Sequence, residues 1–249
     1  MRTIARGTVV PVLTTLREAV LDSLALLLPV ECASCGAPDR PVCASCRSAL
    51  APDPMSRRLA DGTPVFSGLD YDGVARDVLL AFKEQGCVEL SRFLAPALAA
   101  AVSEAFAATG LRPGQQLRGA PVVELVTVPA SRRVRRRRGF DPVVTLVARA
   151  GLDRARVFAP ARPHPAQKTL SFEQRAVNLA DVFAVRVPVA GRRFLLVDDV
   201  VTTGATLLAA ADALRAGGGE VVAAAVVAST PRLHGAAVGL HRERSATFP

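Results

Sequence analysis

Apolar and polar segments alternate along most of the chain and predict a series of strands and helices. Continuous apolar runs predict strands at residues 65–71, 121–128, 156–161, 193–197 and 221–228. Apolar positions at helical spacing predict helices at residues 12–28, 74–82, 91–108, 142–150 and 205–216. Strands that alternate with helices favour a mostly parallel sheet with helices on both faces, which places the chain in the α/β class.

Two stretches interrupt this series and suggest how the chain divides. Residues 31–50 carry four cysteines and few residues that could form a core of their own. Residues 51–64 are rich in Pro, Arg, Asp and Gly, and we interpret them as a linker. The predicted domains are residues 1–60 (N-terminal helix, cysteine segment and linker), residues 61–235 (the α/β domain) and a tail of residues 236–249.

Composition narrows the class of partner. The chain has 249 residues, 50% of them hydrophobic, which suits one α/β domain with a small appendage and argues against disorder. Its net charge is +9, and a chain this basic tends to bind anions such as nucleic acid, phosphorylated small molecules or an acidic surface. Lys83 and Lys168 are the only lysines, so the positive charge is nearly all arginine, whose planar fork suits phosphate.

Neither a membrane span nor a secretory signal is expected. The chain has no run of about eighteen uncharged apolar residues. Its apolar N-terminal stretch is interrupted by polar and charged residues, and no small-residue cleavage site follows. We therefore expect a cytoplasmic location, where disulfides are rare, so the cysteines need another explanation.

The four clustered cysteines have the spacing of a zinc site. Two Cys-x₂-Cys pairs, seven residues apart, are formed by Cys32, Cys35, Cys43 and Cys46. This spacing can supply four thiolates to tetrahedral zinc, and such a site is structural because no position stays open for a substrate. Two disulfides or a redox dithiol are the alternatives, and both fit a cytoplasmic chain less well. The isolated Cys87 is interpreted as a buried or bystander thiol.

Residues 193–207 carry the clearest chemical signal. Their apolar strand places two adjacent carboxylates at a carboxyl end, where open α/β sheets bind ligands. The following loop opens a helix whose N–H groups and dipole favour a phosphate, and its glycine lets the backbone approach closely. Carboxylates beside such a loop suit ribose hydroxyls, or Mg²⁺ on a diphosphate. The predicted binding residues are Asp198, Asp199, Thr202, Thr203, Gly204, Ala205 and Thr206.

A strand–turn–helix with threonine caps is the plainer alternative for this segment. Caps alone do not require paired acids beside the loop, which disfavours that alternative. The chain contains neither Gly-x-x-x-x-Gly-Lys-Ser/Thr nor Gly-x-Gly-x-x-Gly, so two other common nucleotide-binding loops are excluded.

A run of arginines follows the strand predicted at 121–128. It consists of Arg132, Arg133, Arg135, Arg136, Arg137 and Arg138. A pyrophosphate at the carboxyl end of the strand and a nucleic-acid backbone are the two candidate ligands, beside the alternative of a solvated basic loop. Further along, residues 163–178 form a polar segment that includes Gln167 and Arg175.

These motifs carry two resemblances. Residues 193–207 match the motif that binds phosphoribosyl pyrophosphate (PRPP) in type I phosphoribosyltransferases, so the chain resembles that family. Over roughly residues 16–230 it also resembles the ComF family of competence-associated phosphoribosyltransferase-like proteins. The features that carry the second resemblance keep their order: the cysteine pairs, Tyr71-Asp72-Gly73, Phe82-Lys83, Arg138-Gly139-Phe140, the segment from Gln167 to Asn178 and the PRPP motif.

The resemblance implies a type I phosphoribosyltransferase core preceded by an N-terminal helix and a zinc finger. Asp198 and Asp199 would face the ribose and residues 202–206 the 5-phosphate of PRPP, with Mg²⁺ bound. Four further residues are placed near the site with open roles: Lys83, Arg138, Gln167 and Arg175. The family is tied to natural transformation, which implies single-stranded DNA and recombination or uptake proteins as partners.

Three functions are compatible with these features. They are an enzyme that transfers the phosphoribosyl group to an acceptor, a protein that binds single-stranded DNA, and a regulator that senses PRPP without turnover. Aromatic residues make up only 4% of the chain, which weakens the second function because base stacking would have few platforms. The sequence identifies neither the acceptor nor a catalytic base.

Overall fold

The computed structural model of the chain describes four stretches, residues 30–110, 122–129, 138–159 and 183–230. Features predicted outside these stretches are the helix at 12–28, the arginines at 132–137, the polar segment at 163–178 with Gln167 and Arg175, and the tail at 236–249.

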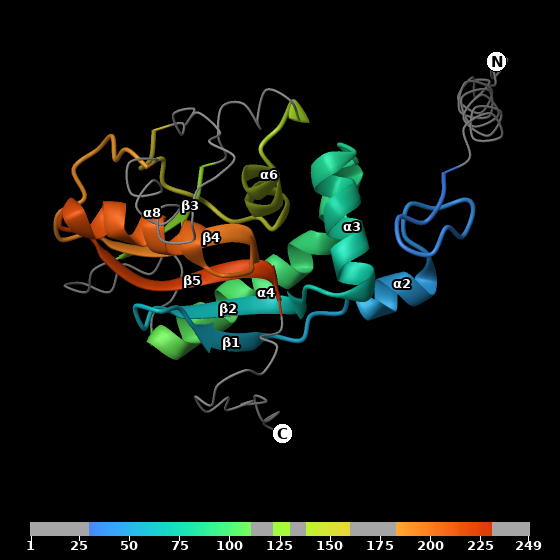
Figure 1. The fold of residues 1–249 in the computed structure, drawn as a ribbon, viewed down its shortest axis with the longest axis horizontal. Coiled ribbons are helices and arrows are strands. Elements are labelled where there is room, and N and C mark those ends of the chain that lie inside the picture. Colours follow the sequence, from blue (N-terminus) through green and yellow to red (C-terminus); the bar gives the residue numbers. More distant parts are fainter. Residues whose placement is uncertain (1–29, 111–121, 130–137, 160–182, 231–249) are drawn as a thin grey trace, which may run out of the picture.

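A five-stranded sheet forms the centre of the structure (Figure 1). Its strands are β1 (Met55–Arg58), β2 (Pro64–Asp70), β3 (Val123–Thr127), β4 (Arg193–Val201) and β5 (Glu220–Ser229). They lie in the order β1-β2-β5-β4-β3, and every neighbouring pair is parallel except β1 and β2, which form an antiparallel hairpin. The mostly parallel sheet predicted from the sequence is therefore confirmed.

Helices cover both faces of this sheet, as predicted (Figure 1). On one side α4 (Ser91–Thr109) lies against β2 and β5, and α3 (Gly73–Glu84) and α6 (Pro142–Arg149) share its apolar core. On the other side α8 (Ala205–Ala216) packs over β4 and β5. These helices confirm the ones predicted at the corresponding residues.

Successive side chains of β4 point to alternate faces of the sheet, which explains why a layer of helices can pack on each face. Leu195 and Val197 belong to the apolar core on the side of α4, whereas Phe194 and Leu196 belong to the core under α8. All four side chains are buried. Because successive side chains of a strand point to opposite faces, a continuous apolar run is what a strand covered on both sides requires.

The long helix α4 is a core helix. Gly68 on β2 lets it approach closely, because a Cβ at this position would lie 2.1 Å from the carbonyl oxygen of Ala97. Within the described stretches, Val88–Thr109 is the one helix long and apolar enough to cross a membrane by length and composition. However, 56% of its apolar window is buried inside the protein, which agrees with a helix packed on a sheet.

The segment 51–64, interpreted as a linker, contains β1, so this interpretation was wrong in part. The strand residues alternate between half-buried and exposed, and they pair with β2 at the edge of the sheet. Periodicity missed the strand because it is short and half of it is arginine. Backbone pairing with β2, rather than its own hydrophobicity, makes it a strand. The domain division after residue 60 stays a prediction.

Two further predicted strands differ from the structure. The one at 156–161 was wrong for its described part, residues 156–159, which forms only an isolated bridge at Phe158; another isolated bridge lies just before it, at Ala155. The one at 193–197 is confirmed but extends to Val201, so Asp198 and Asp199 lie within β4 rather than after it. Pairing with β5 continues past both acids, which gives their backbone a rigid support.

Candidate functional site

A small pocket opens where β4 ends and α8 begins. Asp198 and residues 200–207 line this β4–α8 pocket, which therefore includes every predicted binding residue except Asp199. The loop turns at Gly204, whose φ is +84°, and a Cβ there would lie 2.5 Å from Leu59 Cδ2. The backbone conformation therefore favours glycine, and any side chain here would also have to displace Leu59.

The first turn of α8 forms one side of the β4–α8 pocket. Residues 205–207 belong both to this turn and to the pocket lining. Thr203 Oγ1 accepts a hydrogen bond from the Ala205 N–H at 3.3 Å, which supports the shape of the loop. The first N–H groups of a helix have no intrahelical acceptor, and the helix dipole adds positive potential. This side of the pocket therefore suits an anion such as phosphate.

The two adjacent carboxylates have different surroundings. Asp198 lines the pocket, whereas Asp199 is 8% exposed and its Oδ1 lies 3.0 Å from Lys83 Nζ. Burial, followed by the charge of Asp199, raises the pKa of Asp198 to about 8. The Asp199 N–H, which donates to Asp198 Oδ1 at 2.8 Å, and the Lys83 ammonium oppose this rise only in part. Asp198 therefore holds a proton more readily than an ordinary aspartate.

The end of α3 gathers the two described residues that were predicted near the site from the family resemblance. Lys83, in the last turn of α3, forms an ion pair with Asp199 on β4. The guanidinium of Arg138 pairs with the carboxylate of Glu84, the next residue of α3. The rings of Phe82 and Phe140 pack 5.3 Å apart and attach the same two segments to each other. Arg138 thus lies beside Lys83, but no described contact joins it to the pocket lining.

Arg57, which was not predicted from the sequence, supports the loop of the pocket. Its Nη2 donates to the Thr202 carbonyl oxygen at 2.7 Å, and its Nη1 donates to the Thr230 carbonyl oxygen at 3.4 Å. Arg57 lies 145 positions from Thr202 on a strand that periodicity did not predict, so no local signal could have identified it.

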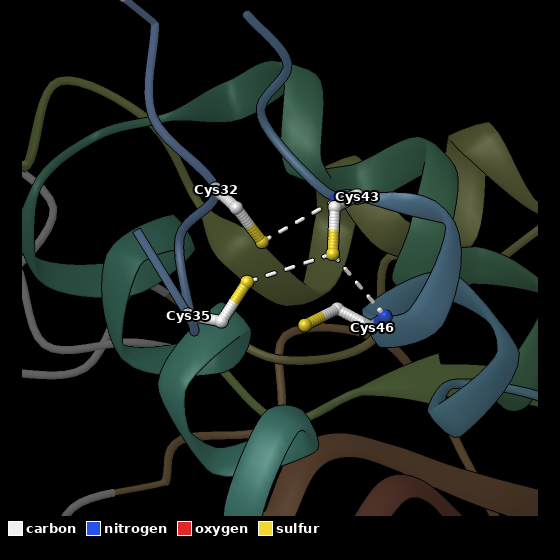
Figure 2. Close-up of side chains that lie close together, drawn as sticks. All are labelled: Cys32, Cys35, Cys43 and Cys46. Carbon is white, nitrogen blue, oxygen red and sulfur yellow. Dashed lines mark hydrogen bonds between the residues drawn. The ribbon is translucent and has the colours of Figure 1, made fainter. Parts of the chain in front are cut away.

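The four cysteines predicted as metal ligands come together (Figure 2). Their sulfur atoms, which belong to Cys32, Cys35, Cys43 and Cys46, all lie within 4.8 Å of one another. Tetrahedral zinc with Zn–S bonds of about 2.3 Å places sulfur atoms about 3.8 Å apart, so small shifts would complete such a site. All four are free thiols rather than disulfides, and the cluster could hold a metal ion such as zinc.

Hydrogen bonds and burial affect these thiols in different ways. The Ser45 hydroxyl, 3.1 Å from Cys43 Sγ, is the main cause that lowers the pKa of Cys43 to about 6. Burial raises the pKa of Cys46 to about 12. The backbone N–H of Cys43 donates to Cys32 Sγ at 3.4 Å, an arrangement that stabilises a thiolate. A bound cation would outweigh this difference in pKa between the thiols, because metal binding displaces their protons.

The cysteine module, residues 31–50, packs against α3. Val42 and Cys46 are buried in the same apolar core as the inner face of α3. The Ser34 hydroxyl donates to Asp77 Oδ2 on α3 at 2.9 Å. The helix that carries Lys83 toward the acids is therefore also the helix on which the cysteine module rests (Figure 1).

Comparison with known families agrees with this geometry. The family model of the phosphoribosyl transferase domain matches residues 152–237, a stretch that contains β4, the β4–α8 pocket, α8 and β5. No match was found among curated proteins. Over this stretch the chain is similar to a phosphoribosyl transferase domain, and the sheet and the pocket after β4 agree with that similarity. The similarity suggests a function of the phosphoribosyl-transfer or PRPP-binding type.

Proposed function

We propose that the chain is a ComF-like phosphoribosyltransferase-domain protein that binds PRPP, or a related ribose 5-phosphate, with Mg²⁺ in the β4–α8 pocket. The observation that carries this proposal is that a strand with two adjacent acids and a helix N-terminus meet at one pocket. A sugar phosphate needs acceptors for its hydroxyls and donors for its phosphate, and the two sides of this pocket supply both.

Each side of the pocket has its own part in binding. The loop at residues 202–206 and the first turn of α8 bind the 5-phosphate through backbone N–H groups and threonine hydroxyls. Asp198 accepts a hydrogen bond from a ribose hydroxyl within the pocket. Asp199 offers a second carboxylate one residue further along, held in place by the Lys83 ammonium.

The donor set also suits Mg²⁺, which binds through one or two carboxylates together with substrate phosphates. When bound, Mg²⁺ would neutralise charge on the diphosphate. The carboxylates of Asp198 and Asp199 would hold the ion, and the Lys83 ammonium pairs with Asp199 beside them.

Transfer of the phosphoribosyl group is the reaction that this arrangement suits. The acceptor forms a bond to ribose C1 as the bond from C1 to the diphosphate oxygen breaks, and diphosphate leaves with the electron pair. The protein contributes positioning and charge stabilisation rather than covalent chemistry. Diphosphate release measured with candidate acceptors separates this enzyme from a PRPP sensor, which would bind PRPP without releasing diphosphate.

Calorimetric titration of Mg-PRPP into the zinc-loaded protein tests the proposal. We expect Asp198→Asn/Asp199→Asn to weaken binding by at least about tenfold, because charge-assisted contacts are lost. Asp212→Asn is the matched control, since this exposed carboxylate lies on α8 outside the pocket lining. Equal affinity of the wild type and the double variant would overturn the proposal.

We also propose that the cysteine module holds one structural zinc ion. Four thiolates are a complete ligand set for zinc, and Cys32 and Cys46 are already buried. The ion would hold residues 31–50 in the conformation that packs against α3.

A role in natural transformation, in the cytoplasm and with single-stranded DNA as partner, is the second candidate. The guanidinium groups of Arg47 and Arg92, both exposed, lie 5.5 and 4.7 Å from the ring centroid of Phe93. Cations beside an aromatic ring can bind a phosphate backbone and stack on a base. Fluorescence anisotropy with labelled oligothymidine tests this role. Binding that weakens in Arg47→Ala/Arg92→Ala and falls with salt supports it, and binding unaffected by this variant would contradict it.

A further inference from the structure

The hairpin of β1 and β2 runs beside the unit formed by the pocket loop and α8. Alternate hairpin residues reach successive parts of that unit. Arg57 binds the Thr202 carbonyl, Leu59 packs against the loop glycine, and Asp61 Oδ2 accepts a hydrogen bond from Arg215 Nη1, near the other end of α8, at 2.6 Å. A hairpin with contacts at both ends of this unit can determine where the unit lies relative to the sheet.

Arg57 makes the contact nearest to the pocket. Its guanidinium bridges two carbonyl oxygens, that of Thr202 after β4 and that of Thr230 after β5. The two chain segments are also joined directly, since the Thr230 N–H donates to the Val201 carbonyl oxygen at 3.0 Å. Arg57 therefore holds the ends of two neighbouring strands where the pocket loop begins.

The orientation of one peptide group follows from this bridge. The peptide bond between Thr202 and Thr203 is trans, so its C=O and N–H point in opposite directions. With the oxygen held toward Arg57, the Thr203 N–H is directed away from the hairpin. Both threonines line the β4–α8 pocket, so the orientation of this peptide group bears on what the pocket can bind.

We propose that Arg57 is a positioning residue for the anion site: it holds the Thr202 carbonyl so that the Thr203 N–H is oriented toward the 5-phosphate. This inference rests on the proposed function for the identity of the ligand. It assigns Arg57 a role through the loop rather than through direct contact with the phosphate. A lysine at this position would keep the charge but could not span both carbonyl oxygens with the planar fork of arginine.

Ribose 5-phosphate and inorganic phosphate, titrated by calorimetry into the full chain, are the probes that test this inference. We expect Arg57→Lys and Arg57→Ala to bind ribose 5-phosphate about tenfold more weakly than the wild type, the effect of one lost hydrogen bond. Arg58→Ala is the matched control. This neighbour on β1 is exposed and donates to the Gly62 carbonyl oxygen of its own hairpin, so its loss should leave affinity within about twofold. Wild-type affinity in Arg57→Lys would overturn the inference, because charge alone would then be sufficient.

A second measurement does not depend on any ligand. Amide hydrogen exchange at residues 203–206 in the ligand-free protein should be faster in Arg57→Ala than in the wild type or in Arg58→Ala. Unchanged exchange would overturn the inference even if affinity fell. If the wild type binds neither probe, the proposed function fails and the phosphate role of Arg57 fails with it, while exchange still decides whether Arg57 holds the loop.

Discussion

Lys83 Nζ lies 3.0 Å from Asp199 Oδ1, so the last turn of α3 is joined to the carboxyl-terminal part of β4. This ion pair connects the two candidate sites. The acids belong to the strand that leads into the β4–α8 pocket, and α3 carries the cysteine module through the contact of Asp77 with Ser34. A change in the packing of α3 therefore affects both sites.

Loss of the Lys83 ammonium should destabilise the fold. Lys83→Met leaves the Asp199 carboxylate buried without its cation, and we expect the free energy of unfolding to fall by roughly 1–3 kcal/mol. Urea unfolding followed by circular dichroism measures this change. Lys83→Met/Asp199→Asn removes both charges and should recover part of the loss. A double variant less stable than the single one would contradict this explanation.

Stability should depend on pH through Asp198. Its pKa is raised in the folded state, so the folded protein keeps a proton that the unfolded chain releases. Its contribution is fully present below the ordinary aspartate pKa and is lost as pH rises toward about 8. Asp198→Asn should therefore be more stable than the wild type at pH 8, by roughly 1–3 kcal/mol, but not at pH 4.

Melting temperatures measured from pH 4 to pH 9 without divalent cations test whether Asp198→Asn gains stability over the wild type as pH rises. Asp212→Asn, which changes an exposed carboxylate on α8, is the control. Its melting temperature should change with pH in the same way as that of the wild type. A difference between Asp198→Asn and the wild type that stays constant with pH would exclude Asp198 as its source.

Gly204 should not tolerate a side chain. Gly204→Ala forces an alanine to φ near +84° and brings its Cβ to 2.5 Å from Leu59 Cδ2. We expect a loss of roughly 1–3 kcal/mol in the free energy of unfolding, together with weaker binding of ribose 5-phosphate. Adding Leu59→Ala should relieve the contact but not the backbone strain. Full recovery of affinity in that double variant would show that the contact alone matters.

Metal removal should affect the cysteine module and the helix beneath it. Protein made in zinc-replete medium should contain about one zinc per chain by elemental analysis. Cys46→Ser should lower the zinc content and the melting temperature, because this thiol is both a predicted ligand and part of the core. Cys87→Ser, outside the cluster, is the control and should keep the metal. Metal-free protein of unchanged stability would contradict a structural zinc.

Local features of this protein were predictable from its sequence because their signals are local. The strand, acid pair, loop and helix at 193–216 are continuous in the chain, and a continuous apolar run followed by a glycine-containing loop specifies them without distant contacts. The four cysteines were also predictable as a metal site, since the Cys-x₂-Cys spacing is itself a local signal and the four sulfur atoms do come together. The role of Gly204 in the binding loop was also predicted, although its close contact with Leu59 was not.

The contacts that complete the site were decided only by the tertiary structure. Lys83 and Asp199 are 116 positions apart, and Arg57 and Thr202 are 145 apart. The family resemblance placed Lys83 near the site but did not identify its partner, and no pattern indicated Arg57. Strand order brings these pairs together: β5 lies between β2 and β4, and β1 becomes a strand only by pairing with β2. Periodicity reports which face of a segment is buried, but which segments become neighbours depends on how the whole sheet assembles.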